Sequence, residues 1–433
     1  MIITSVKEWF IFARDKNFSF FIMLVIMVVM PLHNPYLPPL MILLLLSWIN
    51  DNYFKFNELY RSRDRFKILF LLFLLFFIWQ SVSLMYSANL KVGLQNLGSR
   101  LSMLLFPLIL FSMDGKIKSG LKVLMRLFAV STSLYLVICF IYAIIRSVSL
   151  QNGQVLFYPH PPETEWENYF YNNLLTFSEH PSYMAIYAIL AFLISFESAN
   201  DRLLSNARRV VWIVSGSFLL VSLYFISSRS ALISLIIIIP TYVICNLIKY
   251  HKSKIAWVVL FGLMLLSIPF ILKNERFGNL VTILKGKNSS ELRIQDERII
   301  IWKSAFKVIN DNVLFGAGIG DAREELVNEY NRSGAEKQSS NHMNAHNQFL
   351  QVSVECGMVG LLLFLSIIGF MVYTAITGKN LLYGLFIIMI VIFFMFESVL
   401  YRFAGISFFS LFSFLLLDLN NNNSNNEIPE SIN

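Results

Sequence analysis

Long runs of apolar residues, separated by short polar segments, dominate this chain. A helix needs about 20 mostly apolar residues to cross a bilayer. The runs that approach this length centre on 18–32, 35–50, 67–85, 99–112, 123–146, 181–197, 210–227, 230–248, 255–272, 348–374, 381–397 and 402–418. This pattern predicts an all-α polytopic membrane protein with about twelve transmembrane helices. The first, second and fourth runs are short, so one of them could be re-entrant instead of spanning.

A second periodicity marks the long polar segment between the ninth and tenth runs. Apolar residues alternate there with charged ones at the spacing of a helix, and they are Ile299, Trp302, Phe306, Ile309 and Val313. The spacing predicts an amphipathic helix over 297–313 that lies at the membrane interface.

Three further features follow this helix in the sequence. The turn FGAGIG is rich in helix-breaking glycines, Gly316, Gly318 and Gly320. Asp321 is placed to cap a second short helix. Residues 333–341 are predicted to be a polar, mobile link.

Composition excludes a water-soluble fold. Of 433 residues, 56% are hydrophobic and only 14% are charged, whereas soluble domains carry about 25% charged residues. The net charge of +8 would suggest nucleic acid as the partner of a soluble chain. Here the basic residues lie in loops between apolar runs, as membrane orientation requires. We therefore expect a membrane partner and no nucleic acid.

The basic residues also predict an orientation. With a cytoplasmic N-terminus, the inner segments hold 19 Lys and Arg and the short outer segments hold five, namely Lys91, Arg100, Arg146, Arg229 and Arg402. Positive residues accumulate on the cytoplasmic side. The bias places both termini in the cytoplasm and the two long loops, 147–180 and 273–345, outside.

This orientation divides the chain into four parts. Residues 1–272 hold spans one to nine with the outer loop 147–180, and residues 273–345 form a large helical outer loop. Residues 346–418 hold spans ten to twelve. The Asn-rich residues 419–433 are predicted to be a disordered cytoplasmic tail.

Four arginines are candidates for binding an anionic substrate. Arg229 lies between two apolar runs in ISSRSALIS, where a charge is costly and usually has a partner. Arg298 lies at the start of the amphipathic helix and Arg293 five residues earlier, and a helix N-terminus favours anions. Arg100 opens the fourth run. Arginine binds phosphate through two parallel contacts. The alternatives are anchors at helix ends, whose side chains reach back to water, and solvated charged faces.

Three outward-facing histidines are candidates as well. His346, at the mouth of the tenth run, can act as a general base near neutral pH; a hydrogen-bonded interfacial histidine is the alternative. His342 lies four residues earlier in NHMNAHNQF, but two histidines without a third ligand make a poor metal site, so we expect no metal. His180 precedes Pro181, where the alternative is an element that starts a helix.

The stretch HNQFLQVSVECGMVG carries a family resemblance. It contains His346, Asn347, nine residues, Gly357, two residues and Gly360. This resembles the signature of the O-antigen ligases, the integral-membrane enzymes that attach O-antigen to lipid A–core. Their pattern has Asn, Ser or Gln after the histidine. ISSRSALIS, the segment ERIIIWKSA with its FGAGIG turn, and EHPSY are also similar to segments of this superfamily.

The resemblance implies a function and a location. It implies a bacterial inner-membrane glycosyltransferase that moves a glycan from a polyprenyl diphosphate carrier to an acceptor such as lipid A–core, at the periplasmic face. The displacement would be direct and inverting, without a metal or other cofactor. From the residues we assign His346, Arg229 and Arg298 to catalysis, and Arg100, His180, Arg293, His342 and Asn347 to substrate binding.

Several alternatives remain open. O-antigen and exopolysaccharide polymerases and protein O-oligosaccharyltransferases resemble the ligases closely. The outer loop 147–180 is acidic, which favours a ligase over a polymerase. A transporter would carry charges within its spans, and a sensor or scaffold would not need the arginine–histidine set.

Overall fold

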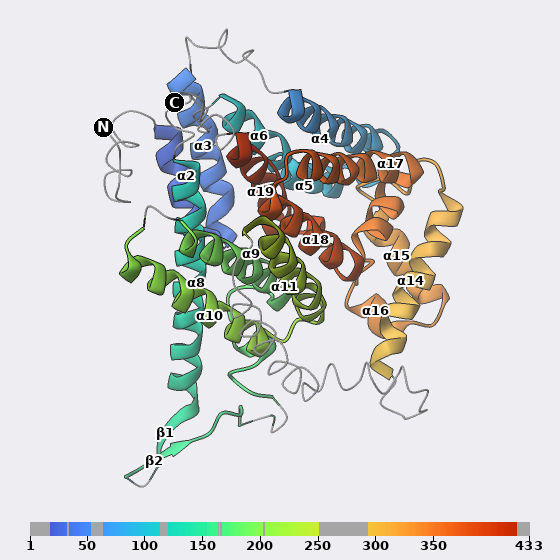
Figure 1. Ribbon diagram of the computed structural model, residues 1–433. Helices are drawn as coiled ribbons and strands as arrows, with labels where there is room; N and C mark the ends of the chain where they lie inside the picture. The colour runs from blue at the N-terminus through green and yellow to red at the C-terminus, as the bar shows by residue number, and fades with distance from the viewer. Residues whose placement is uncertain are drawn as a thin grey trace, which may run out of the picture. The chain divides into compact units, whose positions relative to one another are not determined.

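The computed structural model describes residues 18–32, 34–52, 64–112, 120–151, 153–162, 164, 167–201, 204–250 and 293–421. This part of the chain is helical apart from one hairpin and its connections (Figure 1). Within a bilayer the backbone must satisfy its own hydrogen bonds, which explains why the apolar runs fold as helices. The chain forms two compact units, each built from two separate segments.

The first unit contains the helices α2 (Phe18–Val29), α3 (Leu37–Asn52), α8 (Leu121–Ser147), α9 (Pro181–Ala199), α10 (Asn206–Ile226) and α11 (Arg229–Tyr250). Helix α9 is its core, because nearly every side chain on it is buried. A helix that is apolar on all sides is buried on all sides, and α9 packs against α8, α10 and α11. On α10, Gly216 allows close approach, since a Cβ there would meet the ring of Phe196.

The second unit contains α4 (Asp64–Val82), α5 (Leu90–Arg100), α6 (Ser102–Ser112), α14 (Arg293–Asp311), α15 (Ala322–Arg332), α16 (Glu336–Ser340), α17 (Gln348–Thr377), α18 (Leu381–Phe396) and α19 (Phe403–Asn421). Helix α17 packs against α4, α14 and α18. Aromatic rings fill the core between these helices; the ring centroids of Phe76 and Phe364 lie 5.6 Å apart, and those of Phe394 and Phe409 lie 5.4 Å apart.

Eleven of the predicted apolar runs coincide with helices of the described residues. Within the described ranges, six helical segments are long and apolar enough to cross a membrane, and five more are apolar but shorter. The chain is therefore a multi-helix membrane protein. The run at 255–272 lies outside the described residues, so the count of twelve spans stays a prediction.

The structure adds a β-hairpin to the predicted all-α fold. Strands β1 (Val148–Gln151) and β2 (Gln154–Phe157) pair antiparallel, with Gln151 opposite Gln154. The dipeptide Asn152-Gly153, flanked by alternating apolar residues, is a strong signal for a two-residue hairpin turn. Gly153 has the positive φ of 77° that such turns demand. This dipeptide is the local sequence signal for the hairpin.

The predicted amphipathic helix is confirmed as α14, but its packing differs from the expectation. The buried side chains are Ile301, Ala305 and Val308, which join α15 in a small hydrophobic core. Phe306, from the predicted apolar stripe, is 54% exposed. Trp302 and Ile309, which also belong to that stripe, are partly buried and pack against the same core. Part of the predicted stripe therefore faces α15, and contact of the remainder with the membrane stays a prediction.

Two smaller expectations for the same segment need correction. Asp321 stands at the N-cap of α15, but its side chain does not cap the helix. Its carboxylate instead accepts hydrogen bonds from the N–H groups of Ala88 and Asn89, at 2.6 and 2.8 Å. The segment 333–341, predicted to be a link, contains α16.

The glycine-rich turn after α14 docks into a break in α17. Gly357 has φ 64° and ψ −163° in the middle of that helix, a backbone conformation reserved for glycine. The carbonyls exposed at the break, of Val354 and Glu355, accept from the N–H groups of Ala317 and Gly318 at 2.8 and 3.0 Å. A Cβ on Gly357 would collide with the carbonyl of Leu314.

Candidate functional site

A cation, a carboxylate and a histidine meet where α14, α17 and α18 end or begin. The two oxygens of Glu397, the residue that caps the C-terminus of α18, serve both neighbours. Oε2 lies 3.3 Å from Nδ1 of His346, and Oε1 lies 3.7 Å from a terminal nitrogen of Arg298. The first contact is a hydrogen bond and the second is an ion pair, since 3.7 Å exceeds hydrogen-bonding distance. All three side chains are partly exposed, so the site is open to a ligand.

The arginine of this group is held on two sides. Arg298 belongs to the first turns of α14, and its guanidinium also lies 5.5 Å from the ring centroid of Phe396. A cation over an aromatic face is attracted by the ring quadrupole. The residue is thereby directed toward the end of α18, where Glu397 follows Phe396.

The segment that carries His346 is a tight turn in front of α17. His346 adopts a left-handed backbone with φ 44°, and its N–H donates to Oδ1 of Asn344 at 3.0 Å. Asn347 then caps α17, because its Oδ1 accepts from the N–H groups of Phe349 and Leu350. The histidine is therefore placed at the mouth of α17, as the sequence predicted.

The capping role of Asn347 gives a physical reason for the residues that the family pattern permits there. Asparagine and serine are strong N-cap residues. Its Nδ2 also donates to the carbonyl of Met395 at 3.1 Å, two residues before Glu397. Asn347 thus helps to hold the site together, and its assignment to substrate binding stays a prediction.

The contact with Glu397 decides which nitrogen of His346 is available. A carboxylate accepts only, so it selects the tautomer in which Nδ1 carries the proton. The lone pair then resides on Nε2. A histidine oriented by a carboxylate in this way is arranged to act as a general base.

Tyr401 is a less suitable base. It lies in a short 3-10 helix, Val399–Tyr401, four residues after Glu397. Burial raises the pKa of Tyr401, and the charge of Arg323 only partly opposes this. A phenol with a raised pKa stays protonated at neutral pH, so His346 is the better candidate for a base.

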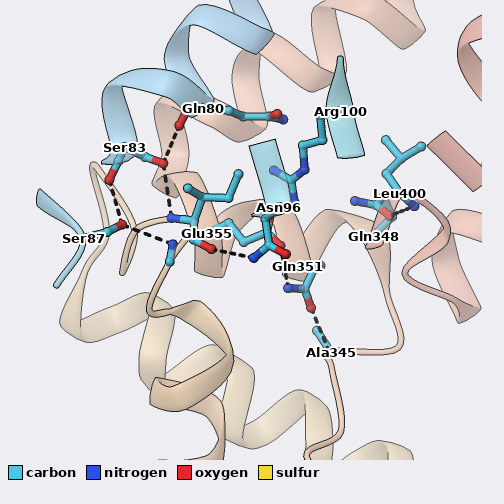
Figure 2. A network of polar contacts seen from close by, with 12 residues as sticks. Gln80, Ser83, Ser87, Asn96, Arg100, Ala345, Gln348, Gln351, Glu355 and Leu400 are labelled. Carbon is cyan, nitrogen blue, oxygen red and sulfur yellow. Dashed lines mark hydrogen bonds and ion pairs between the residues drawn. The ribbon is translucent and has the colours of Figure 1, made fainter. Parts of the chain in front are cut away.

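Arg100 lies elsewhere in this unit. Its guanidinium forms a 2.7 Å ion pair with Glu355 of α17, and the two side chains are 5% and 3% exposed. In this position Arg100 neutralises the buried carboxylate of Glu355 (Figure 2). It does not favour a direct contact of Arg100 with substrate.

In the other unit, Arg229 begins α11 directly after α10. The two helices are joined through Ser227, which has the left-handed φ of 51° and donates from its hydroxyl to Tyr171. Arg229 is partly exposed, and its neighbours Ser228 and Ser230 are buried. A helix N-terminus beside serines suits an anion, which is consistent with the predicted role.

The other three candidate residues, His180, His342 and Arg293, lie at or near the ends of helices. His180 is the N-cap of α9, and its Nδ1 accepts from the N–H of Ser182 at 3.3 Å. His342 is exposed, with φ 47°, after the end of α16. Arg293 is the first residue of α14. Their roles in substrate binding remain predictions.

Sequence reasoning missed Glu397, the residue that contacts both His346 and Arg298. Glu397 is the last residue of the apolar run 381–397, so it was counted as part of that run and not as a candidate site residue. A carboxylate at the edge of hydrocarbon is expensive and usually functional, and this was the available signal. Among the described residues, no group of three or more His, Cys, Asp or Glu could hold a metal ion.

The helices and this site define a membrane protein with an arginine–carboxylate–histidine centre. The family model of the O-antigen ligases matches residues 214–365. The match covers the segment that includes Arg229, Arg298 and His346, and it confirms the resemblance drawn from the motif. No curated protein sequence matches the chain.

Proposed function

We propose that this protein transfers a glycan from a polyprenyl diphosphate carrier to an acceptor sugar such as lipid A–core, at the periplasmic face of a bacterial inner membrane. The observation that supports this best is the contact of one carboxylate, Glu397, with both His346 and Arg298. The match of residues 214–365 to the family model supports the class of substrates, a lipid-linked glycan and a glycan acceptor.

The reaction breaks the bond between the anomeric carbon of the glycan and the diphosphate. Diphosphate is already a good leaving group, so the protein need not supply an acid to protonate it. It needs cations on the diphosphate and a base for the incoming hydroxyl. Arg298 and Arg229 bind the diphosphate and stabilise the charge that develops on it.

His346 then removes the proton of the acceptor hydroxyl. The acceptor oxygen forms a bond to the anomeric carbon as the bond to the diphosphate oxygen breaks, with inversion at that carbon. The proton resides on Nε2 of His346, and the leaving group is the polyprenyl diphosphate. The carboxylate of Glu397 stabilises the imidazolium that forms.

A transporter is less consistent with the described helices. Buried charges within transporter spans mark the path of an ion or substrate. Here the buried charges Arg100 and Glu355 neutralise each other at 2.7 Å, and the partly exposed set of Arg298, Glu397 and His346 lies at helix ends.

Deletion of the gene tests the proposal and separates a ligase from a polymerase. Surface glycans of the mutant are analysed on gels beside those of a complemented strain. Full-length polymer that stays on the lipid carrier supports a ligase. A single repeat unit on the core indicates a polymerase, and an unchanged glycan profile would overturn the proposal.

A further inference from the structure

The first turn of α17 carries two buried glutamines that reach outside their own helix. Gln351 is 1% exposed, and its Oε1 accepts from the N–H of Ala345 at 3.0 Å. Gln348 is 2% exposed, and its Oε1 accepts from the N–H of Leu400 at 2.7 Å. Figure 2 shows both contacts. Ala345 immediately precedes His346, and Leu400 follows Glu397 by three residues.

Glu355 fixes the orientation of the Gln351 amide. Its Nε2 donates to Oε1 of Glu355 at 2.8 Å, and Oε2 of Glu355 is paired with Arg100 (Figure 2). A carboxylate held by a guanidinium offers only acceptors. The amide nitrogen must therefore face Glu355, and the amide oxygen is left to face Ala345. Arg100 thus acts on the turn before His346 through two intervening side chains.

The turn needs such support. His346 has φ 44°, and a non-glycine residue in a sparsely populated conformation persists only when its surroundings hold it there. Ala345 is fully buried, and a buried N–H that loses its acceptor is costly. Without the oxygen of Gln351, the turn would move toward another conformation.

Two adjacent residues at the start of α17, Asn347 and Gln348, hold the backbone on either side of Glu397. Asn347 donates to the carbonyl of Met395 before it, and Gln348 accepts from Leu400 after it. One helix end therefore fixes the backbone that carries the base and the backbone that carries its carboxylate, although 51 residues separate the two side chains.

We propose that Gln348 and Gln351 are positioning residues, which hold the imidazole of His346 against Glu397 for the transfer reaction. This inference rests on the proposed function, in which His346 is the base. A displacement of about 1 Å in a reacting group can lower a rate by on the order of 10²-fold. The two glutamines therefore affect turnover more than they affect donor binding.

The test compares Gln348→Met and Gln351→Met with Ser353→Ala in purified protein. Methionine has nearly the shape of glutamine but offers no amide oxygen. Ser353 is a matched control on the same helix, because it is buried and its hydroxyl donates within α17, to the carbonyl of Phe349 at 2.9 Å. Each glutamine variant should lower kcat by roughly 10- to 100-fold with little change in KM for the lipid-linked donor, whereas Ser353→Ala should stay near the wild type.

The same substitutions in a His346→Ala background separate positioning from general support of the fold. Residues that act as a unit are not additive, so the glutamine variants should cause no further loss of the residual rate. A further loss there, or kcat values equal to that of Ser353→Ala in the parent protein, would overturn the inference. A His346→Ala protein with normal turnover would instead overturn the proposed function, so the two failures are distinguishable.

Discussion

Nδ1 of His346 lies 3.3 Å from Oε2 of Glu397, and this contact fixes the tautomer that a base requires. Glu397→Gln should lower turnover by about 10- to 10³-fold, because an amide can donate to Nδ1 and shift the proton to Nε2. Glu397→Asp, which keeps the charge, should be affected less. Initial rates at saturating donor measure this. Equal rates for Glu397→Gln and the wild type would show that the carboxylate does not orient the base.

Replacing the proposed base, His346, should have a different kinetic effect from replacing the proposed diphosphate ligands, Arg298 and Arg229. Removing His346 should lower turnover by about 10²- to 10⁴-fold while donor binding stays nearly intact. Arg298→Ala and Arg229→Ala should weaken donor binding as well, and Arg→Lys should restore only part, because lysine lacks the forked contact.

An internal control for this series lies on the same helix as Arg298. Lys303 is an exposed cation of α14, so Lys303→Ala should leave both donor binding and rate unchanged. If an arginine variant behaves like Lys303→Ala, the role assigned to that arginine is wrong.

Gly357 should tolerate no side chain. Its φ of 64° and the approach of the Leu314 carbonyl predict that Gly357→Ala destabilises the protein, by roughly 1–3 kcal/mol. Gly369 lies in the same helix with open space around it, and Gly369→Ala should be neutral or stabilising, since alanine favours helix. Thermal unfolding in one detergent compares the two. Similar melting temperatures for both variants would contradict the described break in α17.

The local parts of the structure could be predicted from the sequence. Apolar runs predicted helices because hydrocarbon leaves the backbone no other arrangement, and α14 followed from the spacing of Trp302, Phe306 and Ile309. The FGAGIG turn was visible as a break. Its docking partner, the break at Gly357, was not visible, since it depends on two backbones that approach from distant positions.

Pairs between distant residues were beyond the sequence. Periodicity along one helix does not show that Arg100 meets Glu355, 255 positions later. The sequence could therefore not predict this buried ion pair, and the assignment of Arg100 to substrate binding stays a prediction. Glu397 was missed for a similar reason, because only its contacts with His346 and Arg298 make it a candidate site residue. The candidate base itself was predictable, because a histidine at the mouth of an apolar run is chemically distinctive.

Activity should not depend on a bound metal. Only His342 and His346 suggested a site, and His342 is exposed after α16 while His346 contacts the carboxylate of Glu397. Two ligands are too few for tight binding. Purified protein should keep its initial rate after treatment with EDTA and removal of the chelator. Loss of activity that one divalent ion restores would make His346 a ligand and would require a different mechanism.

The orientation of the chain can be tested with single cysteines. The described part of the chain has Cys139 and Cys356 buried and Cys245 partly exposed, so a Cys245→Ser background leaves little native reactivity. Arg208 and Asn331 are exposed, on α10 and α15. The bias of basic residues toward the inner segments predicts that Asn331→Cys reacts with an impermeant maleimide in cells whose outer membrane admits the reagent. Arg208→Cys should react only after the inner membrane is permeabilised, and both should then react equally. The reverse pattern would invert the topology and place His346, with its acceptor hydroxyl, on the cytoplasmic face.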